Sequence, residues 1–204
     1  MRALRAVVED ACASRGWLEG GKTDPALRLG AYDDARWIAL LQEVMATEPY
    51  RDLGLAPELL RLVRAAVGEP IEAHAGDLVR LVSPGAVDLT TPPHQDGAYL
   101  RNTKRAWSAW LPLGACPIEL GPLAVLPRSH RDGLLPHGPA GSLKGVEVPE
   151  DATWAAADLE EGDVLLFSCM TIHRALPNVT ADRLRMSVDY RYRPQSEATR
   201  GEPS

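Results

Sequence analysis

Near its C-terminus the chain reads Arg185-Met186-Ser187-Val188-Asp189-Tyr190-Arg191-Tyr192. Polar and apolar residues alternate strictly here, which is typical of a β-strand whose two faces meet different surroundings. The apolar set, from Met186 to Tyr192, has to pack in a core or beneath helices. The polar set, from Arg185 to Arg191, is predicted to line an interior pocket at its Arg185 end. A charged face turned outward to solvent is the alternative.

Further strands are expected upstream, in the part of the chain that begins near residue 70. The candidates are the apolar runs Leu78–Val82, Ala106–Leu113, Leu123–Leu126 and Val164–Phe167, which join Met186–Tyr192 of the strand already described. Turns rich in Gly, Pro and Asp separate them, and many short strands punctuated in this way favour a β-sandwich or barrel over βαβ units. We therefore predict a mainly β fold with flanking helices, whose core is a double-stranded β-helix, a cupin-like jelly roll.

Helical periodicity is confined to the first third of the chain. One expected helix carries its apolar residues between Trp37 and Met45, with Asp33 placed to cap it. A second begins with Pro57 and ends at Gly68. We expect these helices to pack on the outside of the β core. The predicted organisation is one domain with a mostly helical part over residues 1–70, the jelly-roll core over 71–194 and a polar, frayed tail over 195–204.

The composition limits the classes of partner. The chain of 204 residues has a formal net charge of −6, whereas nucleic-acid binders usually present a basic face. No apolar run approaches the ~20 residues of a membrane span, and the N-terminus lacks the apolar stretch of a signal peptide. The cysteines are few and widely spaced, unlike those of a disulfide scaffold. We expect a cytoplasmic protein that acts on a small molecule, without nucleic acid or membrane as a partner; protein partners stay open.

One motif is rejected because of its context. The stretch Gly16-Trp17-Leu18-Glu19-Gly20-Gly21-Lys22-Thr23 matches the phosphate-binding pattern G-x-x-x-x-G-K-T. That loop works between a buried strand and a helix, whose N-terminus faces the phosphates. The residues before Gly16 look like a polar-faced helix, and Pro25 disfavours a helical conformation at Asp24. We therefore expect no nucleotide site.

The stretch Thr91-Pro92-Pro93-His94-Gln95-Asp96-Gly97 contains the first candidate metal ligands. In an extended segment His94 and Asp96 project from one face, so both side chains can reach one ion while Gln95 points away. His173, which follows a predicted buried strand, adds a second imidazole. Two imidazoles and one carboxylate are the ligand set of non-haem iron(II) oxygenases, which leave further positions on the metal open. Taken singly, the His94–Asp96 pair could be surface decoration and His173 a hydrogen-bonded core residue.

Arg185 is the candidate for holding an anionic cosubstrate. A guanidinium in an interior pocket needs a counter-charge, because an unpaired buried charge is very costly. A bound dicarboxylate supplies that charge through a two-pronged contact. Ser187, one pleat further on, can donate to the same carboxylate.

These residues resemble a known family, the phytanoyl-CoA dioxygenase-like branch of the iron(II)/2-oxoglutarate-dependent oxygenases. Three blocks carry the likeness: Thr91–Tyr99, Trp110–Leu113 leading to Gly121–Arg131, and Gly162–Tyr192. Arg128 is a departure, because it occupies the glycine position of the family's Pro-Gly-Ser-His turn. The stretch from His173 to Arg185 is also one residue longer than usual, which leaves Arg183, on the same strand face by parity, as a rival for the carboxylate. Arg185 is favoured because it stands two residues before Ser187.

The resemblance implies that His94, Asp96 and His173 bind iron(II). It also implies that Arg185, helped by Ser187, holds the distal carboxylate of 2-oxoglutarate. Trp110 matches a tryptophan that neighbours the cosubstrate, although a plain core aromatic explains it equally well.

The implied cofactors are Fe(II), 2-oxoglutarate and O₂, and the implied reaction oxidises a small molecule with release of succinate and CO₂. Hydroxylation is expected first and desaturation stays open; Asp96 fills the position that halogenating relatives leave to halide. The loop Tyr99–Arg105 and the segment Asp132–Lys144 are candidates for the substrate side. Two other functions remain: a cupin-like metal enzyme without 2-oxoglutarate, such as an isomerase or hydrolase, and a non-catalytic ligand-binding jelly roll.

Overall fold

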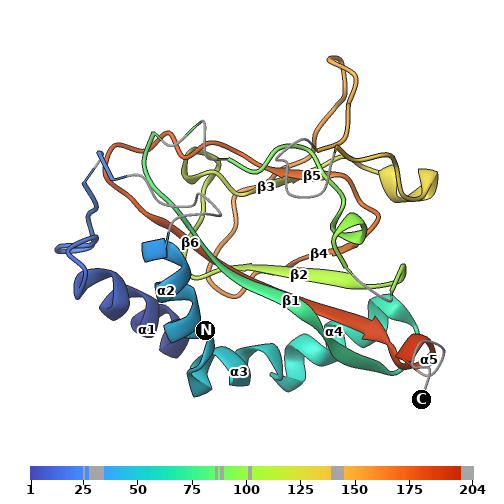
Figure 1. Ribbon diagram of the computed structural model, residues 1–204, viewed down its shortest axis with the longest axis horizontal. Helices are drawn as coiled ribbons and strands as arrows, with labels where there is room; N and C mark the ends of the chain where they lie inside the picture. The colour runs from blue at the N-terminus through green and yellow to red at the C-terminus, as the bar shows by residue number, and fades with distance from the viewer. Residues whose placement is uncertain are drawn as a thin grey trace.

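Two antiparallel sheets and a layer of helices make up the computed structural model. It describes residues 1–24, 26–27, 35–85, 87, 90–100, 103–138 and 145–198. The larger sheet has the spatial order β1 (Ile71–Val82), β6 (Arg185–Pro194), β2 (Trp107–Pro112) and β4 (Leu165–Ser168). The smaller sheet pairs β3 (Leu123–Val125) with β5 (His173–Ala175). The two sheets lie opposite each other, and the helices cover the far side of the larger one (Figure 1).

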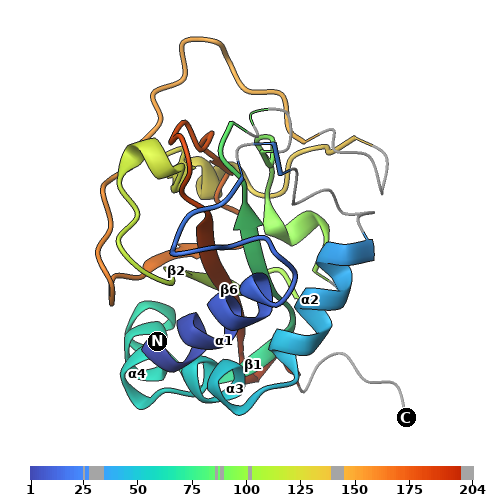
Figure 2. The same cartoon turned by 90° about the vertical axis from the view of Figure 1, so that its left-hand side faces the viewer.

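The helical layer is formed by the N-terminal part of the chain. Its members are α1 (Arg2–Ala13), α2 (Ala35–Met45), α3 (Glu48–Gly54) and α4 (Pro57–Val67). Figure 2 shows them side by side over the strands of the larger sheet. Both predicted helices are confirmed, and Gly68 ends α4 in the left-handed conformation with φ 80°. Asp33, the predicted cap of α2, lies outside the described residues. Among those residues no helix is long and apolar enough to cross a membrane.

The alternation of β6 assigns its two faces as predicted. Val188, Tyr190 and Tyr192 are buried in the core shared with the helices. The hydroxyls of Tyr190 and Tyr192 donate to the backbone carbonyls of Tyr50 and Gly54, each at 2.6 Å, and so fasten the strand to α3. On the opposite face Arg185, Ser187, Asp189 and Arg191 are all at most 4% exposed. The alternative of an outward-facing charged strand is therefore wrong.

The predicted strands correspond to β1, β2, β3, β4 and β6, with two differences. β1 begins at Ile71, because residues 71–74 also pair with β6, on the far side of an irregularity between His74 and Leu78. β5 was not predicted, since a strand of three residues has no periodicity to detect.

Two further segments bear on the sequence predictions. Residues 195–198, expected to be a frayed tail, form the short helix α5 (Gln195–Ala198), where Glu197 accepts a hydrogen bond from the Thr103 hydroxyl. The pattern at Gly16–Thr23 follows α1 instead of a strand, and no helix begins at residues 24, 26 or 27. The rejection of a phosphate-binding loop is consistent with both observations.

Candidate metal centre

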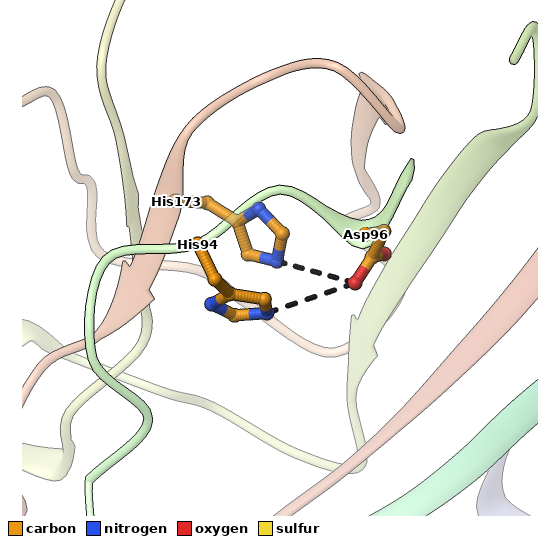
Figure 3. Close-up of side chains that lie close together, drawn as sticks. All are labelled: His94, Asp96 and His173. Carbon is orange, nitrogen blue, oxygen red and sulfur yellow. Dashed lines mark ion pairs between the residues drawn. The ribbon is translucent and has the colours of Figure 1, made fainter. Parts of the chain in front are cut away.

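The structure brings His94, Asp96 and His173 together in the interior. Asp96 Oδ1 lies 3.6 Å from Nε2 of His94 and 3.7 Å from Nε2 of His173 (Figure 3). One potential ligand atom from each residue lies within 4.8 Å of the others. Their relative exposures are 7%, 4% and 3%, so the group is not surface decoration. The cluster is the only group of at least three His, Cys, Asp or Glu residues with metal-site spacing in the described part of the chain.

The backbone explains why residues so distant in sequence meet. His94 and His173 form an isolated antiparallel bridge, with N–H···O distances of 2.9 and 3.0 Å in the two directions. Gln95 is extended, with φ −120° and ψ 127°, and Asp96 then starts a short 3₁₀ helix, Asp96–Ala98. The extended His94-x-Asp96 geometry predicted from sequence thus holds up to Asp96, where the chain turns.

Both imidazoles are held in one tautomer. Nδ1 of His94 lies 2.8 Å from the Pro92 carbonyl, and Nδ1 of His173 lies 3.0 Å from the Thr171 carbonyl. A carbonyl only accepts, so each Nδ1 carries the proton and each Nε2 keeps its lone pair. Burial, reinforced by His94, lowers the pKa of His173 to about 4, so its ring is neutral near pH 7. Two imidazole nitrogens aimed at one point, each ring oriented through its other nitrogen, are typical of a metal site.

The two oxygens of Asp96 have different surroundings. Oδ2 accepts hydrogen bonds from Ser108 Oγ at 2.5 Å and from Arg191 Nε and Nη2 at 3.2 and 3.1 Å. Oδ1 faces the two imidazoles. Burial by itself raises the pKa of the Asp96 carboxyl, but the Arg191 guanidinium, foremost among its neighbours, holds it well below its usual range. Asp96 is therefore an anion with one oxygen directed at the metal position.

Arg185 lies on the same sheet face and has a different environment. It is 1% exposed, and its Nε and Nη1 atoms have no hydrogen-bond partner within the described residues. The hydroxyl of Ser187 and Nε1 of Trp110 are also buried without a partner there. The guanidinium carbon lies 5.8 Å from the centroid of the Trp110 ring. Burial, above all other influences, lowers the pKa of Arg185 to about 10. This group of unsatisfied donors fits a carboxylate that the protein itself does not supply.

Arg183, the rival, lies elsewhere. Its side chain is exposed and Nη2 lies 3.4 Å from the Ala115 carbonyl, beside a cavity of about 190 Å³ that none of the three candidate ligands lines. Strand parity does not reach it, because β6 begins only at Arg185. Buried Asn178 donates to the carbonyls of Val82 and Arg183 and so shapes the loop before the strand.

Several residues of the site were not singled out by sequence reasoning. Ser108 and Arg191 contact Asp96, and they are direct cross-strand partners of β2 and β6. The sequence does contain a signal for them: strand alternation places Ser108 on the same face as Trp110, and Arg191 on the same face as Arg185. Gln95, which points away from the metal position, is fully buried and donates to the carbonyls of Gly133 and Met170. Of the segments predicted for the substrate side, residues 101–102 and 139–144 lie outside the described residues.

The turn that carries Arg128 keeps a glycine-like conformation without a glycine. Arg128 has φ 70° and is the only residue other than glycine with positive φ in the described ranges. Next to it, Ser129 Oγ accepts a hydrogen bond from the backbone N–H of Ile172 at 2.8 Å. The turn therefore supports the segment that leads into His173. Arg128 replaces the family's glycine but adopts the left-handed backbone conformation that favours glycine.

Comparisons with known proteins agree with this arrangement. The sequence profile of the family described as phytanoyl-CoA dioxygenase (PhyH) matches residues 21–187. A 1-deoxypentalenic acid 11-beta-hydroxylase of Streptomyces arenae is 31% identical over 195 residues, covering 86% of this chain and 66% of that protein. The corresponding hydroxylase of Streptomyces exfoliatus is 29% identical, covering 90% of this chain and 72% of that protein. The chain thus spans about two thirds of the length of these curated relatives.

Solved structures share the fold at lower identity. The non-heme alpha ketoglutarate dependent carbocyclase SnoK from nogalamycin biosynthesis superposes with a TM-score of 0.66 at 21% identity, covering 98% of this chain and 81% of that one. The epimerase SnoN in complex with Fe3+, alpha ketoglutarate and nogalamycin RO gives a TM-score of 0.64 at 20% identity, covering 93% and 75%. The predicted jelly-roll fold is confirmed.

Proposed function

The chain belongs to the phytanoyl-CoA dioxygenase family, and from that premise we propose that it is an iron(II)- and 2-oxoglutarate-dependent oxygenase that hydroxylates a small molecule. The proposal rests on two groups of buried side chains on neighbouring elements, and each group lacks a binding partner. One offers two imidazole nitrogens and a carboxylate oxygen aimed at a common point. The other is a buried guanidinium without a counter-charge in the described residues. A metal ion and a dicarboxylate complete both.

His94, Asp96 and His173 would hold the iron. Their donor set suits iron(II), and the Nδ1–carbonyl contacts turn both Nε2 atoms toward the metal position. Bound iron(II), together with 2-oxoglutarate and O₂, supplies the oxidising chemistry and releases succinate and CO₂ as co-products. The three side chains would hold the metal and leave coordination positions for the cosubstrate and O₂.

Arg185, Ser187 and Trp110 would receive the distal carboxylate of 2-oxoglutarate. Arg185 offers a buried positive charge and the unpartnered donors Nε and Nη1, which suit a carboxylate, and Ser187 and Trp110 add one donor each. Because these atoms are buried, the contact takes place away from water, where a charged hydrogen bond is strong. A metal enzyme without 2-oxoglutarate, the second candidate, leaves this donor group unexplained.

The substrate is proposed to be a natural-product intermediate with a largely apolar carbon skeleton. The curated relatives are named for the hydroxylation of 1-deoxypentalenic acid. In this chain Tyr99 lies beside the metal position, with its ring centroid 6.1 Å from that of His94, and is 52% exposed. His137 packs edge-on against Tyr99 at 5.8 Å. An exposed aromatic ring next to the site suits an apolar ligand. We also place the enzyme in the cytoplasm, because its cysteines are three separate, buried thiols.

The first test is anaerobic addition of iron(II) and 2-oxoglutarate, followed by visible absorption. The parent protein is expected to develop a weak charge-transfer band, which His173→Ala loses. Arg185→Ala should need a much higher 2-oxoglutarate concentration to reach the same band. Arg183→Ala is the matched control, because it removes an exposed arginine two residues away, and it should behave like the parent. An iron-loaded parent that shows no band would refute the use of 2-oxoglutarate and favour the second candidate.

Turnover is then measured with 1-deoxypentalenic acid as the first substrate, by succinate release and product mass. A gain of one oxygen atom per succinate supports hydroxylation. Loss of two hydrogens without added oxygen would instead identify a desaturase.

A further inference from the structure

We propose that Arg191 and Ser108 are positioning residues for the metal ligand Asp96, and that a bulge in β1 is the device that places Arg191. The two side chains occupy one carboxylate oxygen so that only the other is presented to the metal. The inference rests on the proposed function for the identity of Asp96 as a ligand. It adds residues and a backbone feature that act through Asp96 and do not touch the metal.

The two buried arginines on the inner face of β6 differ in how their donors are used. Arg185 has Nε and Nη1 without partners in the described part of the chain. Arg191, 4% exposed, directs Nε and Nη2 to Asp96 Oδ2 and Nη1 to the Gly76 carbonyl. The charge of Arg191 is therefore satisfied inside the protein, and we assign it to organising the metal site and not to binding a ligand.

Asp96 is held at one oxygen from two neighbouring strands. Ser108 of β2 and Arg191 of β6 are direct partners in the antiparallel register, so their side chains emerge side by side on one face. Together they direct three hydrogen bonds at Oδ2, which exceeds the two lone pairs of a carboxylate oxygen. Oδ2 has no capacity left for a metal ion. Asp96 can then bind only through Oδ1, which is the oxygen aimed at both imidazoles.

The third strand contributes through its backbone. The register of β1 against β6 shifts between His74, which pairs with Arg191, and Leu78, which pairs with Asp189. Extra residues bulge out here, and Gly76 adopts φ 106°, a conformation that L side chains rarely adopt. The bulge lets the Gly76 carbonyl accept from Arg191 Nη1, while Asp77 Oδ1 accepts from the Arg191 backbone N–H at 2.7 Å. A bulge that re-aims groups beside an active site is a recurrent feature of sheets.

A line of alternating charge continues beyond Arg191. Its Nη2 lies 3.6 Å from Asp189 Oδ2, which also accepts a hydrogen bond from Arg80 Nε at 2.6 Å. Arg80, Asp189, Arg191 and Asp96 thus neutralise one another in sequence. All four side chains are buried or nearly so. The ion pairs with Asp189 and Asp96 therefore restrain the Arg191 guanidinium on two sides. Its planar fork is what allows it to face Asp96 and Gly76 together, and a lysine has no such geometry.

The expected consequence concerns metal affinity in the absence of any substrate. Partners that orient a metal ligand are typically worth 10–100-fold in affinity, so we expect Arg191→Lys to weaken metal binding by about that factor. Ser108→Ala, which removes a single oxygen atom and no charge, should weaken it by about 10-fold. Arg193→Lys is the matched control: it changes an arginine of the same strand that pairs with Glu72 and does not contact Asp96.

The test is an anaerobic titration of the full chain with Co²⁺, read by visible absorption and calorimetry, with 2-oxoglutarate titrated afterwards at saturating metal. We expect weaker Co²⁺ binding and an altered cobalt spectrum in Arg191→Lys and Ser108→Ala, and parent-like behaviour in Arg193→Lys. A structural role alone would lower thermal stability without moving the cobalt spectrum. If Arg191→Lys does not fold, Ser108→Ala decides.

The outcomes separate this inference from the proposed function. Parent-like Co²⁺ affinity and spectrum in folded Arg191→Lys and Ser108→Ala overturn the positioning role and leave the proposed function standing. A parent that binds Co²⁺ but not 2-oxoglutarate overturns the proposed function alone. A parent that binds no Co²⁺ overturns both.

Discussion

Replacing Arg185 with methionine should change stability and cosubstrate affinity in opposite directions. Methionine keeps an unbranched, flexible side chain and removes the charged head. In the ligand-free protein that head is 1% exposed and Nε and Nη1 have no partner among the described residues. Burial of this charge therefore costs free energy in the ligand-free protein, and replacing the charged head with methionine relieves that cost.

The magnitude follows from the burial of the charge. Burial lowers the pKa of Arg185 to about 10, and at ~1.4 kcal/mol for each pKa unit the buried charge costs on the order of 3 kcal/mol. After an allowance for imperfect packing of methionine, the ligand-free variant should gain about 1–2 kcal/mol in free energy of unfolding. Loss of a two-pronged buried charge contact costs roughly 3–5 kcal/mol of binding, so the 2-oxoglutarate dissociation constant should rise about 100-fold or more.

Two measurements check this prediction. Urea unfolding in the presence of a chelator reports the stability of the ligand-free proteins, and calorimetry with Co²⁺ and 2-oxoglutarate reports affinity. Arg183→Met is the control and should change stability by no more than about 0.5 kcal/mol, as is usual for exposed positions. A ligand-free Arg185→Met protein that is destabilised by several kcal/mol and still binds 2-oxoglutarate normally would refute the reasoning, because Arg185 would then serve the fold and not the cosubstrate.

Three further predictions concern stability. Arg128→Gly should raise the free energy of unfolding by about 0.5–1 kcal/mol in urea, because it relieves the strain at φ 70°; a loss of stability would contradict this. Burial raises the pKa of Asp77 to about 6. The protonated carboxyl therefore stabilises the fold below its unfolded pKa, near 4, and this part of the free energy of unfolding is lost as the pH rises through about 6. Asp77→Asn should abolish that loss and be about 1–2 kcal/mol more stable than the parent at pH 7, allowing for partial exposure, and equal stability at pH 7 would argue against it. Co²⁺ at 100 times its dissociation constant should stabilise the parent by about 3 kcal/mol in thermal unfolding but not His173→Ala, and an equal shift in both would place the metal elsewhere.

Much of the candidate site could be predicted because each of its ligands stands in a recognisable local pattern. His94 and Asp96 are two residues apart, and His173 follows a recognisable apolar strand. The alternation in β6 separates the residues that pack under the helices, such as Val188 and Tyr190, from the buried polar face. Both features can be recognised in a single sequence, because strand alternation has a fixed period and metals prefer particular ligand side chains.

Other features escaped because they depend on cross-strand pairing. Strand alternation alone would place Arg183 and Arg185 on the same face. However, β6 begins only at Arg185, and Arg183 lies in the preceding loop, which Asn178 holds through the carbonyls of Val82 and Arg183. The first half of β1 was not recognised, because its bulge at Gly76 interrupts the alternation that marks a strand. That same bulge is what accommodates Arg191.

From its own order of residues, then, the chain specifies a jelly roll with helices on one side, a His-x-Asp…His ligand set and a polar face on its last long strand. The role of each residue on that polar face is decided only in the folded protein. Arg185 and Arg191 have the same side chain and the same parity, yet Nε and Nη1 of Arg185 have no hydrogen-bond partner in the described residues, whereas Arg191 donates to Asp96 and Gly76. The physical reason is that a charge takes its role from the groups within a few ångströms, and these come from strands far away in the sequence.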